Sequence, residues 1–302
     1  MQNTPAAVNH LIKSEGLPND FISTVENYYI PLVHSISQRC LASTNPLVIG
    51  VNGAQGTGKS TLALFLAALL EDMQNLSVVQ FSLDDLYLRK PQRLRLAKEI
   101  HPLLATRGVP GTHDLNLGHM LFESLCSAGE GTRTVIPAFD KATDERLPES
   151  GSHEFRGKPD VIIFEGWCVG SVAQPAIDLA APLNDLERIE DANGVWRSYV
   201  NEQLATAYKD LFNIIDLLVF IRAPGWSCIY DWRLLQEKKL KQRLESEQRD
   251  TSQLMSERQI ARFIQHYERI TRHNLKVLPD KTDYLLEMKP DHSLISLKQK
   301  LR

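Results

Sequence analysis

The segment from Gly53 to Ser60 has the residue types that bind phosphate groups. It reads Gly53-Ala54-Gln55-Gly56-Thr57-Gly58-Lys59-Ser60 and matches GxxxxGK[ST] at every fixed position. Glycines let backbone N–H groups curl around phosphate oxygens, and the positive end of a following helix adds to the attraction. We expect Lys59 to contact the terminal phosphates of ATP, Ser60 to bind Mg2+, and the stretch Gly53 to Thr61 to hold the nucleotide.

A further acidic candidate follows the apolar run Val161 to Phe164. Such a run is typical of a strand buried on both faces, so Glu165 is expected at the carboxyl edge of a sheet, where open α/β sheets bind ligands. There Glu165 could act on Mg2+ directly or through water. The alternative is a carboxylate that caps the next helix or pairs with a neighbour.

Two acids, Asp84 and Asp85, follow another predicted strand, and Tyr87 comes shortly after them. Phosphoryl transfer depends on positioning and charge stabilisation, and a carboxylate commonly accepts the proton of the attacking hydroxyl group. We expect Asp84 to be that base, with Asp85 and Tyr87 beside the phosphate acceptor. Paired acids after a strand are also common helix caps, and that is the alternative.

Two loops carry further polar groups suited to an acceptor. One reads Arg-Gly-Val-Pro-Gly-Thr-His-Asp over residues 107–114, and the other reads Pro-Ala-Phe-Asp-Lys-Ala-Thr-Asp-Glu-Arg over residues 137–146. Both combine backbone-bending Gly or Pro with cations and with hydrogen-bonding groups such as Asp140. The alternative is a pair of solvated turns. The cations that could pair with a carboxylate or phosphate group are Arg107, Lys141 and Arg146.

A basic helix is predicted after residue 226, within a mobile lid around residues 226–258. Closing a lid over a nucleotide would exclude water and bring an arginine to the transferred phosphoryl group, and we assign this role to Arg233. Most charged helix faces are simply solvated, so Lys238, Lys239 and Arg243 receive no role.

Five apolar runs have the length and the bounding turn residues of buried strands. They are residues 47–51, 78–82, 161–165, 217–221 and 284–288. Most are separated by segments long enough for a crossover helix, and residues 60–73 are dense in Leu and Ala. The pattern predicts an α/β fold of the P-loop NTPase type, with a mainly parallel five-stranded sheet, helices on both faces and a helical lid.

The N-terminal part of the chain has a helical pattern, because Phe21, Val25, Tyr29 and Leu32 recur at three- and four-residue steps. We therefore expect a helical extension over residues 1–45, followed by one domain over residues 46–302 that carries the phosphate loop and the lid.

Composition narrows the class of partner. The 302 residues carry 34 Lys and Arg against 37 Asp and Glu, which is not the basic surface of a general nucleic-acid binder. The four cysteines form no CxxC pair, which favours a reduced, cytoplasmic setting. Neither a signal-peptide pattern nor a run of about 18 apolar residues occurs. We expect a small-molecule substrate, with no nucleic-acid or membrane partner, and the oligomeric state stays open.

Several motifs together resemble the D-glycerate 3-kinase family, which is related to uridine kinase, phosphoribulokinase and pantothenate kinase. They are the phosphate loop, Ser-Leu-Asp-Asp-Leu-Tyr, Arg-Gly-Val-Pro-Gly-Thr-His-Asp, Pro-Ala-Phe-Asp-Lys, Phe-Glu-Gly-Trp-Cys-Val-Gly and Asp-Trp-Arg. Many NTPases share the phosphate loop, whereas the Arg-Gly-Val-Pro and Glu-Gly-Trp-Cys stretches are far more selective. The resemblance covers residues 45–290.

The resemblance implies that ATP reacts with D-glycerate to give 3-phosphoglycerate on a five-stranded parallel core with a lid. It assigns phosphate and metal to Lys59 and Ser60, and it aligns Asp84 with the acid that serves as base in the wider kinase group. The residues that it puts near the acceptor are Arg107, His113 and Asp114.

One residue departs from the family pattern. Related kinases usually carry Phe where this chain has Leu86, and the smaller side chain could loosen the acceptor pocket. Residues 1–45 and about 173–195 are not explained by the shared motifs.

The sequence does not decide the identity of the phosphate acceptor. A nucleoside, a sugar phosphate or a pantothenate-like acid could take the place of glycerate, and a nucleoside would need an aromatic slot where glycerate needs a compact cationic pocket. A regulatory GTPase or nucleotide-gated module would change conformation instead of forming a product. That class needs guanine recognition, and the chain has neither an Asn-Lys-x-Asp segment nor a DxxG after the strand at residue 161.

Overall fold

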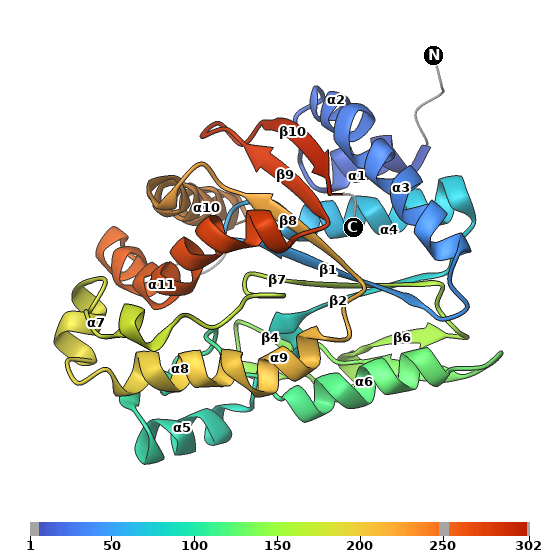
Figure 1. Cartoon of the computed structure of the whole chain (residues 1–302). Coiled ribbons are helices and arrows are strands. Elements are labelled where there is room, and N and C mark those ends of the chain that lie inside the picture. Colours follow the sequence, from blue (N-terminus) through green and yellow to red (C-terminus); the bar gives the residue numbers. More distant parts are fainter. Residues whose placement is uncertain (1–5, 248–253, 301–302) are drawn as a thin grey trace.

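A six-stranded sheet organises residues 6–247 and 254–300, which the computed structural model describes (Figure 1). The strand order is β10-β9-β8-β1-β7-β2, and the neighbours from β9 to β2 are parallel. The parallel strands are β1 (Leu47–Gly53), β2 (Val78–Ser82), β7 (Val161–Gly166), β8 (Leu217–Arg222) and β9 (Tyr284–Met288). All five predicted strands are confirmed, and with them the mainly parallel α/β fold.

The sheet nevertheless has one more strand than predicted. Strand β10 (Leu294–Gln299) pairs antiparallel with β9 at the edge of the sheet, and all of its residues are at least partly exposed. An edge strand with an open face lacks the uniform apolar run by which the central strands were recognised. The prediction of five strands is corrected to six for this reason.

Two small hairpins lie outside the main sheet. Strand β3 (Arg133–Ile136) pairs with β6 (His153–Arg156), and β4 (Phe139–Asp140) pairs with β5 (Glu145–Arg146). Strands of two to four residues carry too little periodicity to be seen in a sequence. The loop predicted over residues 137–146 is therefore a hairpin.

One face of the sheet is covered by the N-terminal helices and α4. These are α1 (Ala6–Ser14), α2 (Phe21–Thr24), α3 (Ile30–Leu41) and α4 (Lys59–Gln74), with one π-helical turn joining α2 to α3. The ring of Phe65 on α4 lies 5.5 Å from Phe21 and 5.8 Å from Tyr29. Ser35 Oγ and Tyr284 Oη are 2.7 Å apart, which ties α3 to β9. The helices predicted before residue 45 therefore cover the core, while a domain boundary at residue 45 stays a prediction.

The other face is covered by α6 and by helices from the second half of the chain. They are α6 (Leu115–Ser127), α8 (Val195–Ala205), α9 (Ala207–Phe212) and α11 (Glu257–Lys281), whereas α5 (Lys90–Glu99) lies farther from the sheet than α8 in Figure 1. Val48 and Phe164 pack on this side, whereas Ile49 and Ile163 pack on the opposite side, as expected for successive strand residues. Leu86 is fully buried here and packs against α6, so it is a core residue, and its effect on an acceptor pocket stays a prediction.

Residues 173–195 pack against α11 through a buried ion pair. The segment contains a 3-10 turn and α7 (Asp185–Glu190). Arg269 Nε and Nη2 donate to the two oxygens of Glu187 at 2.7 and 2.6 Å, and the Glu187 carboxylate is fully buried. A two-bonded guanidinium–carboxylate pair fixes orientation as well as distance, so this segment has a defined place on the fold.

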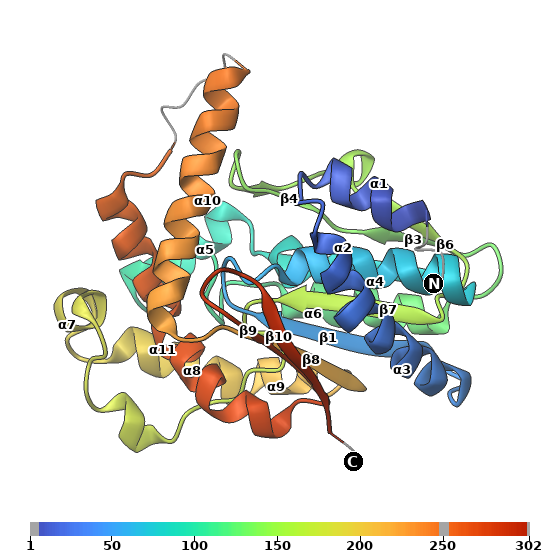
Figure 2. The same ribbon diagram turned by 90° about the horizontal axis from the view of Figure 1, so that it is seen from above.

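Helix α10 (Trp226–Ser246) leaves the sheet and projects beyond it in Figure 2. The predicted lid over residues 226–258 comprises α10 and the start of α11, and its residues 248–253 lie outside the described part of the chain. Movement of this region stays a prediction. Within the described residues, no helix combines the length and the apolar character that crossing a membrane requires.

Candidate active site

The phosphate loop joins the end of β1 to the start of α4. Gly56 and Gly58 have φ angles of +83° and +79°, which L side chains rarely adopt. A Cβ atom at Gly56 would also come within 2.8 Å of Trp232 Cβ on α10. Because α4 begins at Lys59, the first N–H groups of this helix have no helical partner and its positive end borders the loop. The loop therefore has the backbone geometry that phosphate binding needs.

Glu165 lies beside the phosphate loop because β7 is the neighbour of β1. Ser60 Oγ donates to Glu165 Oε1 at 2.9 Å, and Lys59 Nζ lies 3.9 Å from Glu165 Oε2. Glu165 Oε2 is buried and has no hydrogen-bond partner among the described residues. Glu165 thus pairs with its neighbours Ser60 and Lys59, as the alternative expected, and its role toward Mg2+ stays a prediction.

These groups fit Mg2+, which prefers oxygen ligands. The hydroxyl group of Ser60 and the Glu165 oxygen that accepts no hydrogen bond would supply two such ligands in one place. The described residues contain no cluster of three or more His, Cys, Asp or Glu side chains that could hold a metal alone. The ion would therefore take its remaining ligands from nucleotide phosphates and water, which is its usual habit.

Asp84 reaches the same edge because Ser82 of β2 is opposite Glu165 of β7 in the sheet register. Ser82 starts a short 3-10 helix over residues 83–86, and its Oγ accepts a hydrogen bond from Asp84 N–H at 3.1 Å. Asp85 Oδ2 accepts from Ser82 N–H at 2.9 Å and Oδ1 from Phe139 N–H at 3.4 Å. The capping alternative is thus correct for Asp85, whose carboxylate accepts hydrogen bonds from backbone, and the role of Asp84 as base stays a prediction.

The carboxylate of Asp84 is held ionised by its neighbours. Tyr87 Oη donates to Oδ1 at 2.7 Å, and Lys141 Nζ donates to Oδ2 at 2.6 Å. Burial acts to raise the pKa of Asp84, but the charges of Lys141 and Lys59 and these two hydrogen bonds outweigh it and lower the pKa to about 2. Asp84 is therefore a negatively charged hydrogen-bond acceptor at every physiological pH.

Lys141 is placed over Asp84 by the β4–β5 hairpin. Asp144 in its turn pairs with Arg107 and, at 2.7 Å, with the buried Arg93. Arg107 Nη2 also donates to the carbonyl oxygen of Lys141 at 3.1 Å. One carboxylate shared by two guanidinium groups leaves a positive charge beside Lys141. Arg93 and Asp144 could not be predicted as site residues from the sequence, because the residues they pair with lie dozens of positions away in the chain.

The turn at Arg107 and Gly108 is clamped by two aromatic side chains. Trp167 Nε1 donates to the carbonyl oxygen of Gly108 at 2.8 Å, and Tyr267 Oη donates to that of Arg107 at 3.3 Å. Gly108 has φ +130°, and a Cβ there would lie 2.3 Å from Tyr267 Oη. The glycine is required by both conformation and space. Trp167 and Tyr267 were not predicted as site residues, because nothing in their local sequence shows what they contact.

His113 is buried and stacks on Tyr87, with ring centroids 4.7 Å apart. Its Nδ1 lies 2.5 Å from Tyr208 Oη, which also accepts a hydrogen bond from Gly111 N–H at 2.9 Å. We assign the Tyr208 proton to His113 Nδ1, so that Nε2 carries the proton of the neutral ring. Burial lowers the pKa of His113 to about 4. Nothing in the sequence around Tyr208 connects it with the site.

Three other predicted acceptor residues have protein partners of their own. Asp114 caps α6 by accepting from Leu117 N–H at 3.1 Å and pairs with Arg146 at 3.3 Å. Arg146 also donates to the carbonyl oxygen of Tyr87 at 2.9 Å, while its buried Nε has no partner among the described residues. Asp140 accepts from Ala142 N–H and Thr143 Oγ1 within its own turn. These side chains support the frame of the site, and their direct contact with an acceptor stays a prediction.

Arg233 follows Trp232 on α10, and its own side chain is turned to protein partners. It pairs with Glu237 at 2.7 Å, and its guanidinium lies 6.0 Å from the centre of the Phe263 ring. The adjacent Trp232 packs against Gly56 and donates to the carbonyl oxygen of Pro290 at 2.9 Å. Arg233 would have to leave Glu237 to meet a phosphoryl group, so its catalytic role stays a prediction.

Comparison with known proteins gives consistent results, although no protein-family model matches the chain. The uncharacterized kinase mug58 of Schizosaccharomyces pombe is 35% identical over 231 residues, which cover 74% of this chain and 78% of that protein. The chloroplastic D-glycerate 3-kinase of Arabidopsis thaliana is 30% identical over 80% of this chain, but the match spans only 52% of that enzyme. The solved D-glycerate 3-kinase of Cryptococcus neoformans has a TM-score of 0.72 and 25% identity over 90% of this chain and 97% of that one.

Proposed function

Because the chain belongs to the D-glycerate 3-kinase family of P-loop kinases, we propose that it transfers the γ-phosphoryl group of ATP to a hydroxyl group of a small anionic metabolite. D-Glycerate, which would give 3-phosphoglycerate, is our first candidate for the acceptor. The observation that carries the proposal is the ionised carboxylate of Asp84, which meets Lys141 and the phosphate loop at one edge of the sheet.

The nucleotide would lie with its phosphates in the loop from Gly53 to Thr61. Backbone N–H groups and the start of α4 would bind phosphate oxygens, and the ammonium group of Lys59 would contact the negatively charged terminal phosphates. Ser60 and Glu165 would hold Mg2+. Bound Mg2+ would neutralise the negative charge shared by the β- and γ-phosphates.

Asp84 would orient the attacking hydroxyl group. An acceptor hydroxyl that takes over the hydrogen bond now donated by Tyr87 or Lys141 would be aimed by a fixed carboxylate. With a pKa of about 2, Asp84 is a weak base, but the transition state of phosphoryl transfer is loose and the proton leaves the hydroxyl late. Positioning by Asp84, followed by proton acceptance as the O–P bond forms, fits both facts.

The acceptor would be small and negatively charged. Lys141 and Arg107 face the region of Asp84, and the Asp144 carboxylate balances only one of the two arginines that it contacts. A carboxylate group on the acceptor would restore the balance of charge and accept hydrogen bonds from these cations. The neutral His113 would add an N–H donor to an acceptor oxygen without adding charge.

Closure of α10 would complete the site. Its first turns contact the phosphate loop through Trp232, so a tilt of α10 would move Arg233 relative to the γ-phosphate. An arginine there would stabilise the charge of the transferred group and would protect ATP from water.

The test is Mg2+-dependent formation of ADP from ATP with D-glycerate, L-glycerate, uridine, ribulose 5-phosphate or pantothenate as acceptor. We expect stimulation by D-glycerate alone, with 3-phosphoglycerate identified by mass and NMR. Stimulation by another member of the panel would replace the acceptor and keep the reaction. If ATP binds and no acceptor is phosphorylated, the glycerate assignment is lost and a nucleotide-gated module becomes the better description.

A further inference from the structure

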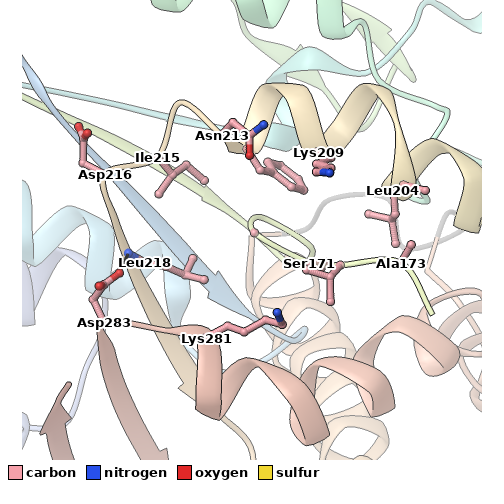
Figure 3. A pocket seen from close by; sticks show the side chains of 14 residues that line it. Ser171, Ala173, Leu204, Lys209, Asn213, Ile215, Asp216, Leu218, Lys281 and Asp283 are labelled. Atoms are coloured by element: carbon pink, nitrogen blue, oxygen red, sulfur yellow. Dashed lines mark hydrogen bonds between the residues drawn. The ribbon is translucent and has the colours of Figure 1, made fainter. Parts of the chain in front are cut away.

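A second concavity lies at the opposite edge of the sheet from the phosphate loop. It has a volume of about 580 Å3 and is bordered by residues 216 and 218 at the amino end of β8 and by Asp283, just before β9 (Figure 3). The phosphate loop follows the carboxyl end of β1, so the parallel strands separate the two places. A volume of this size falls in the range of about 300 to 1,000 Å3 typical of small-molecule pockets.

The floor and walls of this pocket are mostly apolar. They come from three segments: the chain after β7, the α8–α9 pair, and the loop that enters β8. A flat apolar group could pack on them and lose contact with water, which favours binding. The apolar side chains that line the pocket are Val172, Leu204, Phe212, Ile215 and Leu218.

Two exposed polar side chains and one buried hydroxyl group line this apolar space. Lys209 and Asn213 are exposed, and neither the ammonium group of Lys209 nor the side-chain amide of Asn213 has an ion-pair or hydrogen-bond partner among the described residues. Ser171 is 4% exposed, and its Oγ accepts a hydrogen bond from Asn274 at 2.8 Å. The described residues provide no acceptor for the Ser171 O–H. A buried hydroxyl in this state is an unused donor.

The charged groups of the pocket are separated into two ends. The carboxylates lie at the strand end and bind backbone: Asp216 accepts from Val48 N–H and Asp283 from Leu218 N–H, both at 2.8 Å. Lys209 and Lys281 lie away from these acids, on the two sides of the open space in Figure 3. Lys209 therefore adds a positive charge to the pocket away from these acids.

We propose that this pocket binds a small amphipathic anion, with an apolar body against Phe212 and Leu218 and an acidic group at Lys209. Asn213 and Ser171 would donate hydrogen bonds to that group or to an adjacent oxygen. A carboxylate and a phosphate share the required chemistry, since both are compact anions that accept several hydrogen bonds.

Ligand bound there would touch the segment that leads back to the active site. Residues 170–173 line the pocket, and Val169 accepts a hydrogen bond from Asn52 Nδ2 at 2.6 Å, one residue before the phosphate loop begins. The pocket is thus distinct from the catalytic site but joined to it by one short stretch of chain.

The test is isothermal titration calorimetry on the full chain saturated with a non-hydrolysable ATP analogue and Mg2+. The probes are 2-naphthoate and 2-naphthyl phosphate, with 2-naphthalenemethanol as the neutral control. We expect one equivalent of at least one anion to bind, and the anion that binds identifies the acidic group. The neutral probe should bind about tenfold or more weakly, because it loses the interaction with Lys209.

Two variants locate the site. Lys209→Glu should weaken binding of the anion about tenfold. Lys98→Glu, the same change on an exposed face of α5, should keep the affinity for the anion within about twofold of that of the unmodified chain. Ala205→Trp should block the pocket while kinase turnover is kept, which shows that the fold is intact. The proposal is overturned if neither anion binds the saturated chain at millimolar concentration, if an anion binds only when the ATP analogue is left out, or if Lys209→Glu and Ala205→Trp bind it as the unmodified chain does.

Discussion

Replacing Lys141 with methionine should uncouple Asp84 from the cation that keeps it ionised. Methionine preserves most of the length of the side chain and removes its charge and its hydrogen bond to Asp84 Oδ2, which measures 2.6 Å. Burial then acts on Asp84 with only Lys59 and Tyr87 opposing it. We therefore expect the pKa of Asp84 to rise.

The expected size of the effect follows from the present balance. The pKa of Asp84 is about 2, against an ordinary value of 3.8, although burial acts in the opposite direction. Loss of the interaction with Lys141, the largest one that lowers the pKa of Asp84, should raise this pKa by about two units or more. A shift of this size corresponds to roughly 3 kcal/mol in the free energy of ionising Asp84. The low pKa stabilises the fold above pH 3.8, and this stabilisation is lost as the pH falls toward 2. The stability deficit of the variant should thus be present at neutral pH and should shrink in acid.

The assay is the pH profile of kcat/KM with the acceptor varied and ATP saturating. The unmodified chain should lose activity from Asp84 protonation only at the acid end, while Lys141→Met should show its acid limb shifted upward by about two units. Weaker acceptor binding will also lower the whole profile, so the position of the limb is the informative quantity. Lys90→Met, on the exposed start of α5, is the matched control. An unshifted acid limb in Lys141→Met would show that Lys141 does not control Asp84, and the proposed role of the pair would fall with it.

Four further predictions concern the same site. Lys59→Ala should abolish phosphoryl transfer, and Asp84→Asn should lower kcat by about 100-fold or more with little change in nucleotide affinity; near-normal turnover in the latter would remove the assignment of the base. Gly108→Ala should lower the free energy of unfolding by about 2 kcal/mol or more, because its φ of +130° and the contact with Tyr267 leave no room for a Cβ, and urea titration measures this. Tyr208→Phe should cost about 1 to 3 kcal/mol by leaving the N–H of Gly111 unpaired, and it should raise KM for the acceptor but not for ATP; equal effects on both would indicate a purely structural role.

The nucleotide side of the site follows directly from local sequence. The phosphate loop binds through its own backbone, so the spacing of its glycines and Lys59 is enough to predict its conformation and its position between a strand and a helix. The five parallel strands were predicted for a similar reason, because burial on both faces requires an unbroken apolar run. Such features depend on residues that are close together in the chain, so they can be predicted from the sequence.

The sequence could not show which of Asp84 and Asp85 caps the turn and which faces a cation. Both acids follow the same strand, and only the 3-10 turn decides that Asp85 caps Ser82 while Asp84 faces Lys141. The ion-pair partners of the predicted cations could not be predicted either. Arg146 is paired with Asp114, and Arg107 shares Asp144 with a buried arginine that the sequence did not single out.

The sequence by itself determined the class of chemistry, since the phosphate loop and the acids after two strands are local patterns with a fixed place on a parallel sheet. Only the tertiary structure decided which acid is ionised at the site, which aromatic groups clamp the turn at Arg107 and Gly108, and where the pocket beside β8 lies. Ionisation depends on burial and on charges brought together from distant segments, as with Lys141 and Asp84, which are 57 residues apart. Pockets likewise form between elements and belong to no single one of them, so a linear sequence carries no mark of them.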